Sequence, residues 1–351
     1  MSDPILARIE AIIQQDVNRR GLAANPADNL LTACRGDFTH ACRSLAAPGP
    51  KAVAVVTGFY IPEAKAAETD GPLGAVFLAR VLTALGAHVR LAAEHDCAGA
   101  LRAALAACGL ADQVPVVPLP TPAERGDDPG DAPRTELLDR EPALTHLIAV
   151  ERAGPSHSPD SVAQQPRSGP APLEEFRTQV PAAHWHQCHT MRGRVITDQM
   201  YPAHRLFEEV GRAKRRVTTI GIGDGGNEIG MGKIPWEVIA KNVPGGGLVA
   251  CRVPTDATIV CGVSNWGAYG LAAGVWCLSG RPFAAELFSA EAEHALWERV
   301  LREAVLVDGV TGRRELTVDG LPWDEYIRPL REIAALLAAG QASGQDCNLS
   351  C

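Results

Sequence analysis

Acidic and amide side chains follow several of the strands that the sequence predicts. The densest set is the string Gly-Asp-Gly-Gly-Asn-Glu at residues 223–228, which follows an apolar, β-branched segment beginning at Val217. Such a segment is typical of a buried strand, and the glycines allow a tight turn after which Asn227 can open a helix. Hard divalent cations prefer carboxylate and carbonyl oxygens as ligands. We therefore predict that Asp224, Asn227 and Glu228 hold a cation.

Two other interpretations of this string remain open. The spacing of Gly221, Gly223 and Gly226 also fits a dinucleotide-binding fingerprint. Asp224 and Glu228 argue against it, because they place negative charge where a helix N-terminus would meet phosphate oxygens. The plainer alternative makes Asp224 a helix N-cap and Glu228 a favourable residue of the first turn.

Further polar residues lie where other predicted strands end. In parallel α/β sheets, ligands bind beyond the carboxyl ends of the strands, so we expect these residues to share one site. The first set is Thr57 with Gly58. The others are Glu151 with Arg152, which could instead form a surface ion pair, and Glu68 with Asp70 in the loop after the first strand, which could be a simple turn. The last set is Ser264 with Asn265, which could be a helix cap.

Strands and helices alternate along the chain, which predicts an α/β fold. We expect a largely parallel or mixed sheet flanked by helices, Rossmann-like, preceded by an N-terminal helical segment over residues 1–50. The α/β domain spans 51–340 and a tail covers 341–351. The expected strands are 52–56, 88–92, 114–117, 145–150, 217–223, 248–253 and 257–263.

Residues 155–188 look like an insertion into this domain. Their first part is rich in Ser, Pro and Gln, which predicts a mobile segment and possibly a lid. The insertion ends in a string that holds His184, His186, Cys188 and His189. These side chains could be zinc ligands, but we consider zinc the weaker interpretation because their spacing matches neither a zinc finger nor His-Glu-x-x-His.

Composition limits the classes of partner. A formal net charge of −8 argues against nucleic acid or an anionic membrane as the main partner. The ten cysteines include no Cys-x-x-Cys pair, and the first residues show neither a signal peptide nor a transit peptide, so we expect a reducing, cytoplasmic location. The apolar stripe of Ile5, Ile9, Ile12 and Ile13 indicates packing or a homo-oligomer contact.

Several of these strings together resemble the D-glutamate cyclase family. They are Glu68-Thr-Asp-Gly-Pro72, Ala149-Val-Glu-Arg-Ala-Gly154, Met191-Arg-Gly193, the Gly-rich string 220–232, Ser264-Asn-Trp-Gly267 and Asp308-Gly-Val-Thr-Gly312. The resemblance implies conversion of D-glutamate to 5-oxo-D-proline and water, with a divalent cation such as Mg²⁺ or Mn²⁺. The sequence departs from the family in its long, His-rich link before Met191 and in having Thr190 where Asn is usual.

A mechanism follows as a hypothesis. A cation makes the γ-carboxylate electrophilic, and a carboxylate takes the ammonium proton. Phosphate ester hydrolysis by the same metal centre, and a regulatory module that binds nucleotides, are the alternatives. The expected metal ligands are Asp224, Asn227 and Glu228 with Glu151 or Asp70, and the expected base is Glu68 or Glu151. The substrate carboxylate would be anchored by Arg152 or Lys233, and the oxyanion would accept the N–H groups of Gly225 and Gly226. The expected substrate contacts are Thr57, Gly58, Ser264 and Asn265.

Overall fold

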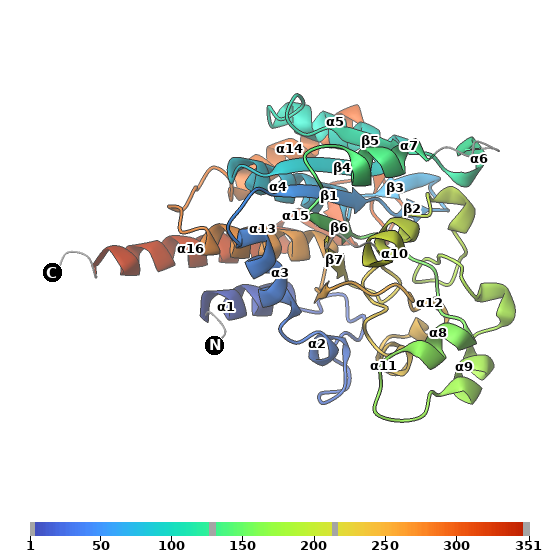
Figure 1. The fold of residues 1–351 in the computed structure, drawn as a ribbon. Coiled ribbons are helices and arrows are strands. Elements are labelled where there is room, and N and C mark those ends of the chain that lie inside the picture. Colours follow the sequence, from blue (N-terminus) through green and yellow to red (C-terminus); the bar gives the residue numbers. More distant parts are fainter. Residues whose placement is uncertain (1–3, 126–130, 213–216, 347–351) are drawn as a thin grey trace.

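A six-stranded sheet forms the centre of the molecule (Figure 1). The computed structural model describes residues 4–125, 131–212 and 217–346. Every strand pair in the sheet is parallel, and the strands lie in the order β5-β4-β1-β6-β7-β8. The strands are β1 (Ala52–Thr57), β4 (His88–Glu94), β5 (Val116–Leu119), β6 (His146–Val150), β7 (Thr218–Gly223) and β8 (Ala257–Val260).

This strand order is that of a doubly wound fold, and it confirms the predicted α/β class. The chain runs outward from β1 to β5, then returns to the other side of β1 and continues from β6 to β8. The order reverses between β1 and β6, where ligands bind in such sheets. The strand expected at 248–253 is wrong: α12 (Gly246–Val249) and a loop occupy this stretch, because Gly245 adopts a left-handed conformation and starts a short helix.

Helices cover both faces of the sheet. Alternate strand residues, such as Val53 and Val55, pack on the larger helical layer, whereas Ala54 and Val56 face the opposite layer. The larger layer contains α1 (Pro4–Ile13), α3 (Asp37–Ala46), α4 (Pro72–Ala84), α5 (His95–Ala107), α13 (Ser264–Leu278), α14 (Ala290–Glu303), α15 (Trp323–Tyr326) and α16 (Arg328–Asp346). The opposite layer includes α2 (Leu30–Ala33), η1 (Thr135–Asp139), α10 (His204–Arg212) and α11 (Trp236–Asn242).

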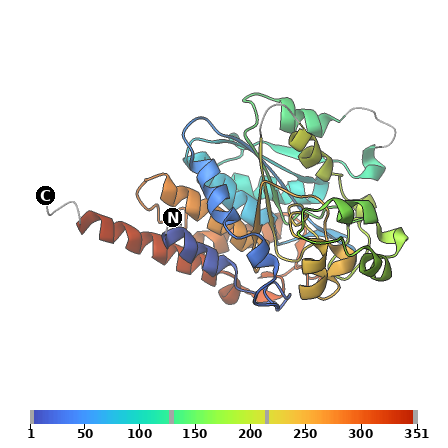
Figure 2. The ribbon, with the colours of Figure 1, turned by 60° about the horizontal axis from the view of Figure 1, so that its bottom comes forward.

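The N-terminal segment packs onto the main domain. Helix α1 contacts α13 and α16, and the two helices α1 and α16 run side by side (Figure 2). Residues 14–29 form a loop that interrupts the helical structure expected between residues 5 and 47. The expected tail begins inside α16, which continues to Asp346, and residues 347–351 lie outside the described part of the chain.

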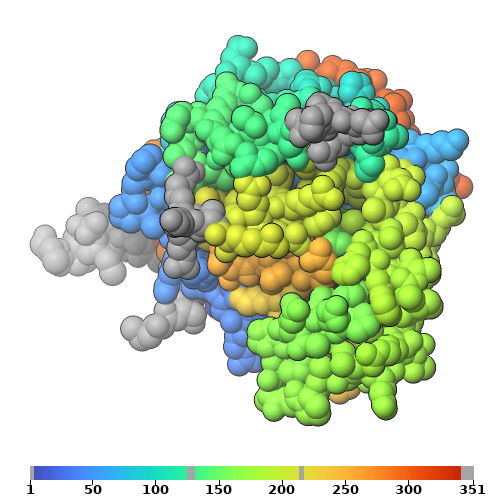
Figure 3. Space-filling view, turned by 45° about the vertical axis from the view of Figure 1, so that its right-hand side comes forward, coloured from blue at the N-terminus to red at the C-terminus, as the bar shows by residue number. Residues whose placement is uncertain are grey.

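The segment 155–188 is folded into short helices, which its composition did not predict, and its mobility stays a prediction. It contains α8 (Pro159–Gln164), α9 (Leu173–Gln179) and η2 (Ala182–His184), and it forms the green mass at the lower right of Figure 3. Phe176 is fully buried and packs edge-on against Trp236 of α11 at a ring separation of 5.2 Å. This single aromatic anchor was hard to recognise within a sequence dominated by polar residues and proline.

Two small sheets bring the C-terminal part of the chain to the end of β1. Strand β3 (Ala66–Glu68) pairs with β2 (Tyr60–Ile61) and with β9 (Leu306–Val307). Strand β10 (Thr317–Val318) pairs with β11 (Leu321–Pro322). The loop between β9 and β10 thereby lies beside Glu68. The remaining short helices are α6 (Pro122–Arg125), α7 (Ala132–Arg134) and η3 (Thr197–Gln199), and no helix in the described ranges meets the length and hydropathy needed to span a bilayer.

Candidate active site

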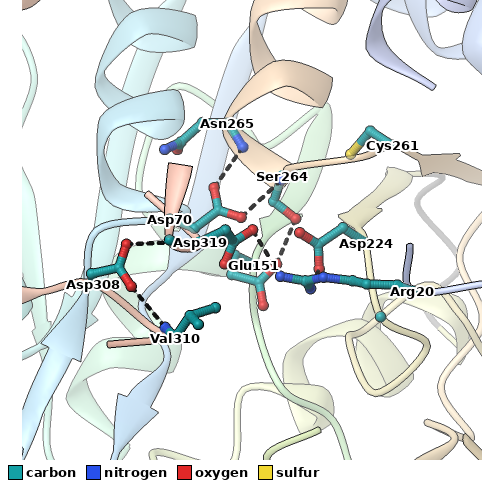
Figure 4. Close-up of polar contacts among 12 residues, drawn as sticks. Arg20, Asp70, Glu151, Asp224, Cys261, Ser264, Asn265, Asp308, Val310 and Asp319 are labelled. Atoms are coloured by element: carbon teal, nitrogen blue, oxygen red, sulfur yellow. Dashed lines mark hydrogen bonds and ion pairs between the residues drawn. The ribbon is translucent and has the colours of Figure 1, made fainter. Parts of the chain in front are cut away.

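Carboxylates from separate strand ends meet where the strand order reverses. Glu151 follows β6 and Asp224 follows β7, and both side chains are buried. Carboxylate oxygens of Glu151, Asp224 and Glu228 lie within 4.8 Å of one another, and so do those of Asp70, Asp224 and Asp319. The structure therefore brings together the four acidic residues that were expected to bind a cation, around Asp224 as the shared member. Figure 4 shows three of them, Asp70, Glu151 and Asp224.

Asp70 is held between the N-termini of two helices. Its carboxylate accepts hydrogen bonds from the N–H groups of Gly71, Ser264 and Asn265 at 2.8–3.0 Å, so it faces the first turns of α4 and α13 together. A helix N-terminus favours negative charge. The cap of α13 is thus the carboxylate of Asp70, and the interpretation of Ser264 and Asn265 as a cap is wrong. Ser264 Oγ instead donates to Glu151 at 2.6 Å.

Glu228 closes the Gly-rich turn on itself. Its two carboxylate oxygens accept the N–H groups of Asp224, Gly225 and Gly226 at 2.6–2.7 Å. This has three consequences. No helix starts at Asp224 or Asn227, so the N-cap interpretation is wrong; the next helix is α11. The N–H groups of Gly225 and Gly226 are occupied, which contradicts their predicted role as oxyanion donors. The same occupation removes the donors that a dinucleotide phosphate would need.

Two buried oxygens of this turn point to a ligand. Asp224 Oδ2 and Asn227 Oδ1 are buried without a hydrogen-bond partner, as is Thr57 Oγ1 at the end of β1. Asn227 is oriented by its own amide nitrogen, which donates to the His189 carbonyl at 2.8 Å. A buried polar atom without a partner is costly. Oxygens of this kind, next to several carboxylates, fit a hard divalent cation such as Mg²⁺ or Mn²⁺.

Arg20 is the principal residue of the site that the sequence interpretation missed. It comes from the loop between α1 and α2, and its guanidinium forms ion pairs with Asp224 and Asp319. Its side chain is 18% exposed, whereas those of Asp224 and Asp319 are 0% and 4% exposed. No motif surrounds Arg20, so only the packing of the N-terminal loop could reveal its position.

Two Asp-Gly turns near the C-terminus, Asp308-Gly309 and Asp319-Gly320, also belong to this region. Asp308 is fully buried and accepts N–H groups of Val310, Thr311 and Gly320 at 2.7–2.9 Å, which joins the two turns. Asp319 adopts a positive φ of 54° next to Gly320. The joined turns place Asp319 against Arg20 and Gly309 against the carboxylate of Glu68.

A cavity of about 290 Å³ opens onto these carboxylates. Its inner wall contains Glu68, Glu151 and Asn227. Its outer wall is mainly apolar, and the only cationic side chains on its walls, within the described residues, are Arg20 and Arg192. Further lining residues are Phe59, Ile61, Glu63, Thr190, Met191, Val243, Pro244, Gly309, Val310 and Asp319.

The carboxyl groups around the cavity have perturbed pKa values. Burial raises the pKa of Glu68 and Glu151 well above the ordinary carboxyl range, and neighbouring carboxylates raise both further. Burial also raises the pKa of Asp224, against the opposing effect of Arg20. The pKa of Asp70 rises to about 7 through burial and the charge of Asp319, although its backbone hydrogen bonds lower it. Such a cluster takes up either protons or a cation.

The two predicted carboxylate anchors, Arg152 and Lys233, form ion pairs away from the cavity. Arg152 is fully buried, forms a bidentate ion pair with Glu94 and donates to the carbonyls of Thr57 and Gly58, so its predicted role as substrate anchor is contradicted. The alternative of a surface ion pair is equally wrong. Lys233 pairs with Asp37 at 2.6 Å and does not line the cavity.

Asn265 and Gly58 are structural neighbours of the site. Asn265 Oδ1 accepts the N–H groups of Gly71 and Gly74, and its nitrogen donates to the Thr69 carbonyl, so the amide holds the turn into α4. Gly58 has a φ of 99°, which allows the chain to leave β1 sharply.

The histidines at the end of the insertion diverge. His184 Nδ1 and His189 Nε2 are hydrogen-bonded at 3.0 Å, whereas His186 lines a different cavity. Both groups of possible metal ligands found among the described residues consist of carboxylates alone.

Comparison with known proteins agrees with this geometry. The model of the family described as D-glutamate cyclase-like, C-terminal, matches residues 9–163 and 179–334. The chain belongs to the D-glutamate cyclase-like family. The match passes over residues 164–178, which lie within the folded insertion, and it includes Arg20 and all the carboxylates described above.

A curated relative supports the same assignment. The chain is 27% identical over 279 residues to human mitochondrial D-glutamate cyclase, which covers 78% of this chain. The matched region spans 39% of the human protein's length. The location of the human protein differs from the cytoplasmic location expected here, which therefore stays a prediction. The eight cysteines that the structure describes form no disulfides.

Proposed function

We propose that this cavity catalyses lactam formation, in which D-glutamate becomes 5-oxo-D-proline and water. The reaction joins the α-nitrogen to the carbon of the side-chain carboxylate, which is Cδ, and breaks one C–O bond of that carboxylate. The two protons that leave the ammonium group and the departing carboxylate oxygen together form the water. The observation that carries the proposal is that one cavity, in a chain of the D-glutamate cyclase-like family, is lined by Glu68 and Glu151, whose pKa values are raised, and by Asn227, whose Oδ1 has no partner.

Glu68 and Glu151 are the proposed proton carriers. Both line the cavity, and burial raises the pKa of both carboxyl groups well above the ordinary range, which suits groups that take up and release protons. Glu151 keeps a fixed orientation through Ser264 Oγ, which donates to its Oε2. Glu68 is packed against Gly309, where only hydrogen leaves room for the carboxylate. One of the two accepts a proton from the amine, and the other protonates the departing oxygen.

Asp224, Asn227 and Asp70 are the proposed cation ligands, which leaves Glu151 for the proposed proton transfer. A divalent cation bound there supplies Lewis-acid polarisation of the γ-carboxylate. Glu228 orients Asp224 and Asn227, because its carboxylate oxygens hold three N–H groups of the turn; its role as a further cation ligand stays a prediction.

Arg192 replaces Arg152 and Lys233 as the proposed partner of the substrate's α-carboxylate. Of the two cations on the cavity wall, Arg20 is engaged by two carboxylates, whereas Arg192 makes one hydrogen bond, from Nη2 to the Val310 carbonyl at 3.0 Å. Arg192 is exposed, so it is available to a carboxylate at the cavity entrance. Arginine binds carboxylates in a bidentate manner.

The test is lactam formation from D- and L-glutamate with Mg²⁺ or Mn²⁺, followed by mass spectrometry. We expect turnover with D-glutamate, and a loss of about 100-fold or more in Glu68→Gln and in Asp224→Asn. Glu298→Gln on exposed α14 is the matched control and should retain full activity. Phosphate release from an aryl phosphate, without lactam formation, would replace this proposal by the phosphatase alternative.

A further inference from the structure

A second cavity lies on the other side of Arg152 from the acidic centre. Its volume is about 470 Å³, larger than that of the candidate active site. The buried Arg152 separates the two regions, because its Nη1 donates to Thr57 and Gly58 while its Nη2 donates to the Tyr201 carbonyl, and Tyr201 lines the second cavity. The histidine string of the insertion contributes His186 and Cys188 to the wall.

The charge of this cavity is the opposite of that of the active site. Its wall contains Arg205, Arg252, His186 and His204, and no carboxylate from the described residues lines it. The remaining lining is largely proline, Met200 and Tyr201. A concave surface with two guanidinium groups and two imidazoles attracts anions, since the low-dielectric walls concentrate the field of the charges.

Both arginines retain unused donors. The guanidinium of Arg205 is exposed and makes no hydrogen bond or ion pair with any described residue. Arg252 uses Nη1 for Glu208 at 2.6 Å, and its Nε is buried without an acceptor. The wall therefore carries two guanidinium groups, of which only that of Arg252 has a carboxylate partner, so a bound oxyanion would neutralise the remaining positive charge.

The arginines of this region also lower the pKa values of nearby histidines. Burial lowers the pKa of His204 to about 4, and Arg252 and Arg205 lower it further although Glu208 opposes them. Burial lowers the pKa of the neighbouring His157 to about 3, helped by Arg252, Arg167 and His186. Both rings are therefore neutral at pH 7, and His204, which lines the cavity, adds hydrogen-bonding capacity there without extra charge.

We propose that this cavity binds a small, multiply charged oxyanion, with Arg205 and Arg252 as its principal partners. Phosphoryl and polycarboxylate compounds share this chemistry, and both fit a site of guanidinium donors with an apolar floor. The site is separate from the proposed lactam-forming centre, and its occupation can be measured without any turnover.

Isothermal titration with inorganic phosphate, pyrophosphate and citrate tests the proposal. The titrations use the full chain at low ionic strength, after divalent cations have been removed by dialysis against a chelating resin, so that metal-bound anions at the acidic centre do not contribute. We expect at least one anion to bind, with an affinity that falls as salt rises. A preference for pyrophosphate identifies a phosphoryl ligand, and a preference for citrate identifies a polycarboxylate.

Arg205→Gln is the decisive variant, because this exposed side chain holds no other part of the fold. It should weaken binding by about tenfold or more, the equivalent of one charge-assisted contact. Arg252→Gln should act in the same direction, with circular dichroism to verify folding, and Arg102→Gln on the exposed side of α5 should leave the affinity unchanged. The proposal is overturned if none of the three anions binds, or if Arg205→Gln binds as tightly as the unmodified chain.

Discussion

Replacing Arg20 by Met should destabilise the cation-free protein strongly. The substitution leaves Asp224 and Asp319, which are 0% and 4% exposed, without their positive partner. Removing one member of a buried ion pair costs about 3–5 kcal/mol, because the other charge stays buried and uncompensated. Arg299→Met is the matched control: its partner Glu303 is exposed, and the loss should stay below about 1 kcal/mol.

The cost at Arg20 should depend on pH and on divalent cations. Burial already raises the pKa of Asp224 well above its ordinary value, so acid lets the carboxyl take up a proton and relieves the variant. The stability difference should therefore be largest near pH 8 and should shrink toward pH 5. A divalent cation should stabilise the variant more than the unmodified chain, since Asp224 Oδ1 is released; a ligand at 100 times its Kd contributes about 2.7 kcal/mol.

Urea unfolding followed by circular dichroism, with EDTA or with Mn²⁺, measures both effects. Four conditions for each of three proteins give the comparison: two pH values, each with and without the cation. The reasoning is refuted if Arg20→Met loses no more stability than Arg299→Met at pH 8. It is also refuted if Mn²⁺ stabilises the unmodified chain more than the variant.

Three further results are expected. Arg192→Met should raise KM for D-glutamate about tenfold or more with little change in kcat. In steady-state kinetics the variant should also discriminate less between D-glutamate and its α-amide. Unchanged discrimination would exclude a contact between Arg192 and the α-carboxylate. Gly309→Ala places a methyl group against the Glu68 carboxylate without left-handed backbone strain. Turnover should therefore fall at least about tenfold, while the free energy of unfolding in urea changes by less than about 3 kcal/mol. Normal turnover would contradict the assigned position of Glu68. Burial lowers the pKa of His146 to about 4, so protonation of this ring favours the unfolded chain. The free energy of unfolding should therefore fall as the pH drops from 6.5 toward 4, by up to about 1.4 kcal/mol per pH unit. His146→Gln should flatten this slope in a pH series of urea titrations, and an unchanged slope would rule out His146 as its source.

Much of the sheet could be predicted from sequence because its strands are buried on both faces. Ala52–Thr57 and His146–Val150 form short apolar runs that end at polar residues, and this pattern marks both the strand and the place where a ligand binds. Glu151 and Asp224 were found in this way. Their gathering needed no knowledge of side-chain packing, since parallel strands end at the same edge.

The partners of these carboxylates could not be predicted in the same way. Arg20 and Asp319 lie on loops at opposite ends of the chain, and only the packing of α1 against α16 and the pairing of β3 with β9 brings them together. Arg152 was misassigned for a related reason. It stands next to Glu151 in the sequence, but adjacent residues at a strand end diverge, and Arg152 turns toward Glu94 at the end of β4.

The course of residues 14–29 has a practical consequence for dissecting the protein. A shortened version that started at β1 would keep every strand of the central sheet, and sheet topology alone would recommend it as a minimal domain. It would nevertheless lack the guanidinium that lies between Asp224 and Asp319. Deletion series and N-terminal fusions therefore probe the chemistry of the acidic centre as well as folding, and an inactive truncation would not by itself indicate a misfolded sheet.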